Sequence, residues 1–286
     1  MTMRWFTWCA ASITLLAFLA PGRVLAANVY FVDYTFESFP DGSFRDRFSL
    51  SRVNADGTGR EEVVHDMGPQ PQYAGLVVEK GVVYWNGFDN VTRAATTAGV
   101  LLGPTSPPNP RVGAEVIGRA IDAAGVHTYF PERNQFNQID RIVRADFEYG
   151  NPVTFVPTRD FEPNLSIALD EPAGKIYWAG SWGGDKAGLV QRANLSDGSH
   201  VETLLENFTS DDYTVDLALD LAAGKMYLGN SSLKLIQRAN LNGSGLETIV
   251  TDTYVFAMAL DTTVPEATGV LVVGAGACWA LGRRRR

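Results

Sequence analysis

Few side chains in this sequence have the type and spacing that catalysis or metal binding requires. His65, His127 and His200 lie far apart, and none has a neighbouring residue typical of a metal ligand set. A metal centre built on all three would require them to converge on one axis of the fold. Asp211 and Asp212 lack the alternating spacing of a calcium-binding loop. The sequence also contains no Gly-x-Ser-x-Gly elbow, phosphate-binding loop or His-Glu-x-x-His segment. We therefore predict no catalytic residue, no metal site and no cofactor.

Trp182 is the single candidate for a ligand-binding side chain. It is followed by two glycines and an aspartate, so it lies in a predicted hairpin. An indole in this position either stacks on a sugar ring or covers its own hairpin, and the sequence leaves both alternatives open. Two insertions are further candidates for partner binding: residues 37–48 with three phenylalanines, and the proline-rich residues 105–111. Variable loops on a rigid scaffold commonly carry binding sites.

Composition narrows the classes of function. The 286 residues include 24 Lys or Arg and 32 Asp or Glu, a formal net charge of −8. An acidic chain is unsuited to binding nucleic acid through phosphate contacts. Its two cysteines, Cys9 and Cys278, lie close to the ends of the chain. Thiol catalysis and a disulfide scaffold are therefore not expected in the part between them.

A repeat organises the central part of the chain. Tyr177 follows Asp170 by seven residues, and the same spacing separates Asp220 from Tyr227, fifty residues further on. In both copies a Gln-Arg-Ala-Asn-Leu segment and a Glu-Thr pair follow, and Ala-Gly, Asp-Gly or Asn-Gly dipeptides mark the turns. Short apolar runs bounded by such turns are typical of antiparallel strands. Each repeat therefore predicts one four-stranded blade of a β-propeller.

Weaker copies extend the repeat over residues 27–263. The predicted second strands each carry one tyrosine: Tyr30, Tyr84, Tyr129, Tyr177 and Tyr227. The N-terminal copy lacks a first strand, and the apolar run around Met258 lacks a second one. We therefore predict an all-β protein with a single β-propeller of five four-stranded blades, one of them closed by the N- and C-terminal strands. Six blades remain the alternative.

Two charged positions recur with the repeat. One is an arginine of the third strand: Arg52, Arg93, Arg144, Arg192 and Arg238. The other is an acidic residue at the end of the first strand: Glu79, Asp122, Asp170, Asp220 and Asp261. A catalytic residue is needed once, whereas a residue required by the packing recurs in every blade. We therefore interpret both sets as structural, with each arginine bound to a carboxylate or backbone carbonyl of a neighbouring strand.

The repeat resembles the YWTD repeat, also called the low-density-lipoprotein-receptor class B repeat. The resemblance rests on the Leu-Ala-Leu-Asp, Lys-Ile-Tyr-Trp and Gln-Arg-Ala-Asn-Leu segments, and it is strongest over residues 165–252. The chain departs from that family after the aromatic pair, because only the segment ending in Asp33 keeps the terminal aspartate. The family usually has six blades. The resemblance thus implies the fold and does not transfer a receptor ligand.

The two ends of the chain have the patterns of targeting signals. Residues 1–26 combine Arg4, an apolar run and a Val-Leu-Ala site, which predicts a cleaved secretory signal peptide. Residues 264–286 form a second pattern of a short motif, an apolar run and a basic cluster. Its motif and cluster residues are Val264, Pro265, Glu266, Arg283, Arg284, Arg285 and Arg286. The apolar run is short for a membrane span, so we expect only a transient membrane contact by a C-terminal helix.

This tail resembles the PEP-CTERM sorting signal of Gram-negative bacteria, in which an exosortase processes the exported protein. Ala267 stands where that family usually has a second proline, which leaves cleavage of the tail open. The resemblance implies an exported protein at the cell surface or outside the cell.

Two functions are consistent with these features. The first is a non-enzymatic binding or structural module of the cell envelope or extracellular matrix, with a surface protein or an exopolysaccharide as its partner. The second is a secreted propeller enzyme, a polysaccharide lyase, glycosidase or lactonase, with a carboxylate site on the propeller axis. Because the sequence shows no singular axial carboxylate, we predict the binding module.

Overall fold

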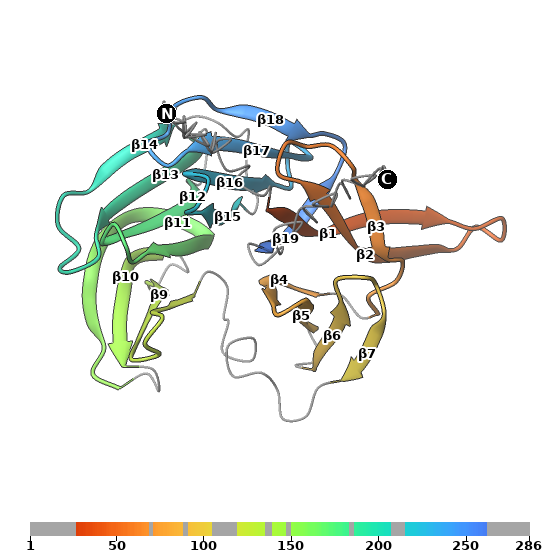
Figure 1. Ribbon diagram of the computed structural model, residues 1–286, viewed down its shortest axis with the longest axis horizontal. Helices are drawn as coiled ribbons and strands as arrows, with labels where there is room; N and C mark the ends of the chain where they lie inside the picture. Colours follow the sequence, from red (N-terminus) through yellow and green to blue (C-terminus); the bar gives the residue numbers. More distant parts are fainter. Residues whose placement is uncertain are drawn as a thin grey trace, which may run out of the picture.

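The computed structural model describes residues 27–68, 71–87, 91–104, 119–134, 139–146, 150–182, 186–206 and 215–261. Every regular element among these residues is a β-strand. The strands form three sheets of four strands and one sheet of seven. Figure 1 shows these sheets around a common centre, which is the arrangement of a β-propeller. The all-β prediction is therefore confirmed.

One four-stranded sheet contains both ends of the described chain. Its strand order is β19 (Tyr254–Asp261), β1 (Asn28–Ser38), β2 (Phe44–Asn54) and β3 (Glu61–Val64). Asn28 pairs with Asp261 at one end of the β1–β19 ladder, and Tyr34 pairs with Tyr254 at the other. This order confirms the prediction that the C-terminal strand completes the N-terminal sheet. It also removes the open edge that β1 would otherwise present.

The two other four-stranded sheets follow the order of the chain. One comprises β4 (Pro71–Glu79), β5 (Val82–Gly87), β6 (Thr92–Thr96) and β7 (Leu101–Pro104). The other comprises β15 (Val215–Asp220), β16 (Lys225–Asn230), β17 (Leu235–Asn240) and β18 (Glu247–Val250). Each is the antiparallel meander that the repeat predicts.

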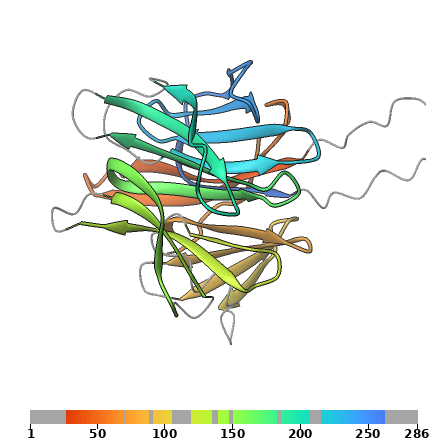
Figure 2. The ribbon, with the colours of Figure 1, turned by 90° about the vertical axis from the view of Figure 1, so that its left-hand side faces the viewer.

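The seven-stranded sheet contains one unusually long strand. Its order is β14 (Glu202–Glu206), β13 (Lys186–Asn194), β12 (Lys175–Trp182), β11 (Val153–Asp170), β10 (Ile139–Asp146), β9 (His127–Arg133) and β8 (Ala120–Ile121). The first part of β11 pairs with β10 and its last part pairs with β12. The chain thus continues from one meander into the next within β11, without a turn between them. In Figure 2 this sheet, coloured green to teal, faces the viewer.

Aromatic side chains fill the space between neighbouring sheets. Tyr30, Tyr177 and Tyr227 are at most 1% exposed, and so are Trp85 and Trp178, which each directly follow the tyrosine of their strand. Their burial explains why large aromatic residues recur in the second strands. A hairpin glycine permits the close packing: Gly243, at φ +83°, places the β17–β18 turn so close to β14 that a Cβ would lie 2.3 Å from the Leu204 carbonyl oxygen.

The recurring arginines connect neighbouring sheets, as predicted, at three positions. Arg52 donates to the backbone oxygen of Thr97, Arg192 to that of Leu241 and Arg238 to that of Ala55. Each also forms an ion pair with the glutamate opposite it on the fourth strand: Glu61, Glu202 and Glu247. Arg144 instead lies over the ring of Phe155, 5.5 Å from its centroid.

Arg93 does not occupy the recurring position, so this part of the prediction is wrong. The recurring arginine pairs with the strand tyrosine, as Arg192 does with Tyr177. In the β5–β6 ladder Tyr84 pairs with Ala94, and Arg93 pairs with Trp85 instead. Since neighbouring residues of a strand point to opposite faces, Arg93 points away from the face that the other arginines share.

The recurring aspartates have structural roles, as predicted. Asp170 accepts a hydrogen bond from the backbone amide of Ala173, and Asp220 accepts one from that of Ala223. Asp122 accepts bonds from the amides of Val126 and His127. Each carboxylate therefore holds the turn between the first and second strands.

The signal peptide, residues 1–26, and the sorting tail, residues 264–286, lie outside the described residues. In the part of the chain that the structure describes, no helix is long and apolar enough to cross a membrane.

Candidate functional site

A hairpin that projects from the first sheet carries exposed aromatic side chains. β1 and β2 are eleven residues each, and their distal ends extend beyond the neighbouring sheets at the right of Figure 1. Phe36 and Phe44 are 60% and 63% exposed, and their rings stack with centroids 5.0 Å apart. Phe39, in the turn of the hairpin, is 43% exposed. Large apolar side chains gathered in this way mark interaction surfaces.

A groove of about 570 Å³ lies at the base of this hairpin. Its described residues come from four separate parts of the chain: Asp33, Tyr34, Thr35, Phe36, Arg60, Lys234, Asp252 and Tyr254. Tyr34 and Tyr254 meet edge to face, with ring centroids 5.7 Å apart. The groove therefore combines aromatic surface with two carboxylates and two cations.

Local contacts fix the charged side chains of the groove. The Arg60 guanidinium donates to the Asp33 carboxylate at 2.7 Å and to the Thr251 carbonyl oxygen at 3.3 Å. The Lys234 ammonium lies 4.3 Å from the centroid of the Tyr254 ring. On the hairpin, the Tyr34 hydroxyl donates to Asp46 at 2.7 Å, and this bond holds the pKa of Tyr34 above its usual range. These contacts orient the aromatic rings before any ligand arrives.

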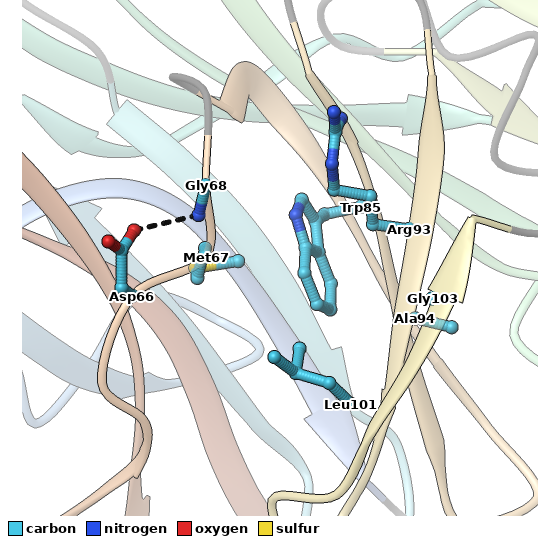
Figure 3. Close-up of a pocket in the computed structure, with 8 residues that line it drawn as sticks. All are labelled: Asp66, Met67, Gly68, Trp85, Arg93, Ala94, Leu101 and Gly103. Carbon is cyan, nitrogen blue, oxygen red and sulfur yellow. Dashed lines mark hydrogen bonds between the residues drawn. The ribbon is translucent and has the colours of Figure 1, made fainter.

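A second, smaller cavity of about 220 Å³ lies on the other side of the hairpin, between the β3 and β5–β7 sheets. Figure 3 shows its walls: Asp66, Met67 and Gly68 follow β3, and the remaining residues come from β5–β7. These are Trp85, Arg93, Ala94, Leu101 and Gly103. Trp85 and Met67 are 1% exposed, whereas Leu101 is 55% exposed, so the cavity has a buried floor and an open side.

The indole Nε1–H of Trp85 is a buried donor without an acceptor among the described residues. In Figure 3 this nitrogen lies on the side of the ring that faces Met67 and Gly68. The reason is visible by comparison with β12, where Trp178 occupies the equivalent position. Trp178 pairs with Gln191 of the next strand, whose Oε1 accepts the indole hydrogen bond at 3.2 Å. Trp85 pairs with Arg93, which carries only donors.

Asp216 is a buried carboxylate, 4% exposed. It lies on β15, an inner strand, and burial raises its pKa above the usual range. Its oxygens accept hydrogen bonds from the Ser166 hydroxyl at 2.8 Å and from the backbone amides of Leu217 and Met258 at 2.9 and 2.6 Å. These donors come from β11, β15 and β19, so Asp216 links three inner strands. This use of the carboxylate is structural and supplies no argument for an axial catalytic site.

The three histidines do not form a common site. His65 Nδ1 contacts Glu62, His127 Nδ1 contacts Asp122, and His200 Nδ1 contacts Asn194 and Ser199. Within the described ranges, no three His, Cys, Asp or Glu side chains lie close enough together to hold a metal ion.

Trp182, the candidate from the sequence, ends β12, where its backbone pairs with Phe161 and Lys186. Its side chain and the insertion at residues 105–111 lie outside what the structure describes. The hairpin insertion at residues 37–48 does form part of the candidate site. The sequence interpretation missed the groove residues Arg60, Lys234 and Tyr254, because a repeat pattern does not reveal which loops of separate sheets meet.

Comparisons with known proteins add little to this description. No family model and no curated protein matches the chain. A solved structure titled as a nidogen/laminin complex is 12% identical, with a TM-score of 0.44 over 82% of this chain and 98% of that one. The computationally designed Ika8 protein is 14% identical, with a TM-score of 0.32 over 79% and 63%. Hydrazine synthase of Kuenenia stuttgartiensis is 11% identical, with a TM-score of 0.35 over 76% and 65%.

Proposed function

We propose that this protein is a non-enzymatic binding module that holds a partner through the hairpin and the groove at its base. The observation that carries the proposal is the set of exposed phenylalanines, Phe36, Phe39 and Phe44, beside a groove with aromatic walls and charged residues. An apolar centre surrounded by charged groups is typical of protein interfaces, where a few aromatic anchors supply most of the affinity. The surface therefore favours a protein partner over an exopolysaccharide.

We also propose that the domain is a propeller of five blades with YWTD-type repeats. In this count the long strand β11 provides the last strand of one blade and the first strand of the next. Five tyrosine-bearing second strands support the count: β1, β5, β9, β12 and β16.

Export to the envelope of a Gram-negative bacterium is a further part of the proposal. It rests on the sequence patterns of residues 1–26 and 264–286, the second of which resembles a tail processed by an exosortase. A surface protein of the same cell is then the expected partner, and membrane contact through the tail is transient.

The test measures the affinity of the purified full chain for an envelope protein of the same cells. A candidate partner is first cross-linked to the wild-type chain on whole cells, then purified and titrated in solution. The double variant Phe36→Ser/Phe44→Ser removes the exposed aromatic pair, and we expect it to weaken binding by tenfold or more. Exopolysaccharide from the same cells is titrated in parallel.

Leu221→Ser/Leu246→Ser is the matched control. These leucines are also exposed, at 38% and 36%, but they lie in the turns that precede β16 and β18. We expect the control variant to bind like the wild type. Equal affinity of both double variants, or binding of the exopolysaccharide alone, would contradict a protein-docking role of the hairpin.

A further inference from the structure

The cavity beside Trp85 has the properties of a site for one side chain. Its volume of about 220 Å³ exceeds the roughly 150 Å³ of an engineered apolar cavity that binds benzene. The Trp85 ring, Met67, Ala94 and Leu101 supply apolar walls. Thioether and aromatic groups both make favourable contacts with an aromatic ring. The cavity therefore matches one six-membered aromatic ring in size and surface.

The buried indole nitrogen adds a chemical requirement. Trp85 is 1% exposed, and its Nε1–H has no acceptor among the described residues. A buried donor without an acceptor is costly, so a ligand that supplies an oxygen here gains more than an exposed hydrogen bond would give. In Figure 3 the carboxylate of Asp66 lies beyond Met67 and Gly68 as seen from Trp85, and it accepts from the Gly68 amide at 2.9 Å. The indole donor therefore requires an acceptor from the ligand, and a hydroxyl oxygen can accept from an indole.

Among the described residues, the polar side chains that line the cavity are too few for a sugar ring. A pyranose carries several hydroxyl groups, each of which needs a partner when it is buried. Its described lining residues offer Trp85, Asp66 and Arg93 as polar side chains, and the other described lining residues are apolar or glycine. A phenol, with one hydroxyl on an apolar ring, satisfies both the walls and the donor.

The position of the cavity connects it with the hairpin. Asp66, which lines the cavity, forms an ion pair with Arg45 of β2, next to the exposed Phe44. The opposite strand of the same hairpin provides Phe36 to the groove. The groove and the cavity thus both adjoin the hairpin, the groove through Phe36 and the cavity through the Asp66–Arg45 ion pair.

We infer that this cavity binds a tyrosine side chain of the protein partner, whose hydroxyl accepts the hydrogen bond of Trp85 Nε1. The inference rests on the proposed function in its choice of a protein partner. It makes the cavity a specificity site: a tyrosine fits, whereas a phenylalanine leaves the indole donor unpaired.

The first experiment needs no partner. The full chain, labelled with ¹⁵N, is titrated with N-acetyl-tyrosinamide, N-acetyl-phenylalaninamide and methyl β-glucoside, and the indole N–H signals are followed by NMR. The Trp85 signal is assigned by its loss in Trp85→Phe. We expect the tyrosine amide to shift this signal and to bind about tenfold more tightly than the phenylalanine amide. Shifts by the glucoside alone, equal affinity of both amides, or no shift of the Trp85 signal would overturn the inference.

Two variants separate the role of the donor from the integrity of the fold. Arg93→Gln places at this site the acceptor that Gln191 provides for Trp178, so the indole bond forms within the protein and the preference for tyrosine disappears. Trp178→Phe is the matched control, because it removes an indole that already has its acceptor, and it should keep the preference. Retained preference in Arg93→Gln would contradict the assigned hydrogen bond.

The outcome for the cavity is distinguishable from that for the docking surface. Phe36→Ser/Phe44→Ser tests the hairpin with the whole partner and should leave probe binding at Trp85 unchanged. If the probe binds at Trp85 and the hairpin changes do not weaken binding of the partner, the docking surface fails and the tyrosine site stands. If the hairpin changes weaken binding of the partner but no probe shifts the Trp85 signal, the tyrosine site fails and the docking surface stands.

Discussion

The strand pairs β5–β6 and β12–β13 place the same indole in two different environments. In both, a tryptophan follows the strand tyrosine, is fully buried, and faces the third strand at the same register. Trp178 finds an acceptor in Gln191, which in turn donates to Thr203. Trp85 faces Arg93 and borders a cavity. The indole is thus paired where the third strand carries glutamine, and it is a buried donor without an acceptor among the described residues where that strand carries arginine.

The β16–β17 ladder has a third combination of residues at the position where Trp178 pairs with Gln191. In the β16–β17 ladder Leu228 pairs with Gln237, so the glutamine is present and the tryptophan is not. The Gln237 Oε1 is then a buried acceptor without a donor among the described residues. Tryptophan and glutamine therefore act as a pair, and either residue alone leaves a buried polar group unsatisfied.

The largest expected effect concerns the tryptophans themselves. Trp178→Ala should lower the free energy of unfolding by about 4 kcal/mol, because it removes a fully buried ring and leaves a cavity. Trp85→Ala should cost roughly 1–2 kcal/mol less, since it also removes an unpaired donor next to an existing cavity. Urea unfolding of both variants measures the difference. Equal losses would show that the two environments are energetically alike.

Gln191→Arg transfers the β6 arrangement to β13. It leaves the Trp178 donor unpaired and removes the bond to Thr203, so we expect a loss of about 2 kcal/mol in the free energy of unfolding. The same urea titration measures it, with the exposed substitution Thr203→Ala as control for the second bond. A variant as stable as the wild type would mean that the indole bond of Trp178 contributes nothing.

Arg93→Gln makes the reverse change and should stabilise the protein by about 1 kcal/mol, because a buried donor gains its acceptor. Thermal unfolding detects this as a rise in Tm. A lower Tm would indicate that contacts of the Arg93 side chain outweigh the unpaired indole.

The smallest effect is expected at Asp216 and appears as a dependence on pH. Because burial raises the pKa of this carboxyl in the folded protein, its contribution to stability is fully present below the usual pKa of an aspartate. This contribution is lost as pH rises through the raised value. Asp216→Asn removes the titration but keeps a group that can accept from the Met258 amide. The variant should therefore show a flatter profile of unfolding free energy against pH, and parallel profiles would contradict the assignment.

Local repetition made most of the fold predictable. The seven-residue spacing from Asp170 to Tyr177 and from Asp220 to Tyr227 marks strand, turn and strand, and these features depend on neighbouring residues only. The missing first strand before Tyr30 and the orphan strand at Met258 predicted their pairing in one sheet. The register between two strands depends on residues distant in sequence, so a repeat pattern predicts it less well. Arg93 is the only arginine of its segment, and the pattern therefore placed it one residue away from the position that pairs with the tyrosine.

The candidate site was less predictable because it joins residues distant in sequence. Tyr34, Lys234 and Tyr254 meet only after β19 has paired with β1, and no periodicity within a strand records that meeting. Asp216 was missed for another reason, since it directly precedes the recurring Leu-Ala-Leu-Asp segment and has no counterpart of its own type in the Ile167–Asp170 copy. The signal that could have revealed it is this difference between copies: Ser166 stands at the equivalent position and is its hydrogen-bond partner.

The pairing of Asn28 with Asp261 also fixes where the two ends of the described chain lie relative to the groove. The described chain enters and leaves at the same end of one ladder, whereas Tyr34 and Tyr254, which line the groove, pair near the opposite end. Anything attached beyond Asp261 therefore holds the domain by the face opposite the groove. A tether at that end would leave the groove and the aromatic hairpin at the opposite end of the ladder, facing away from the attachment.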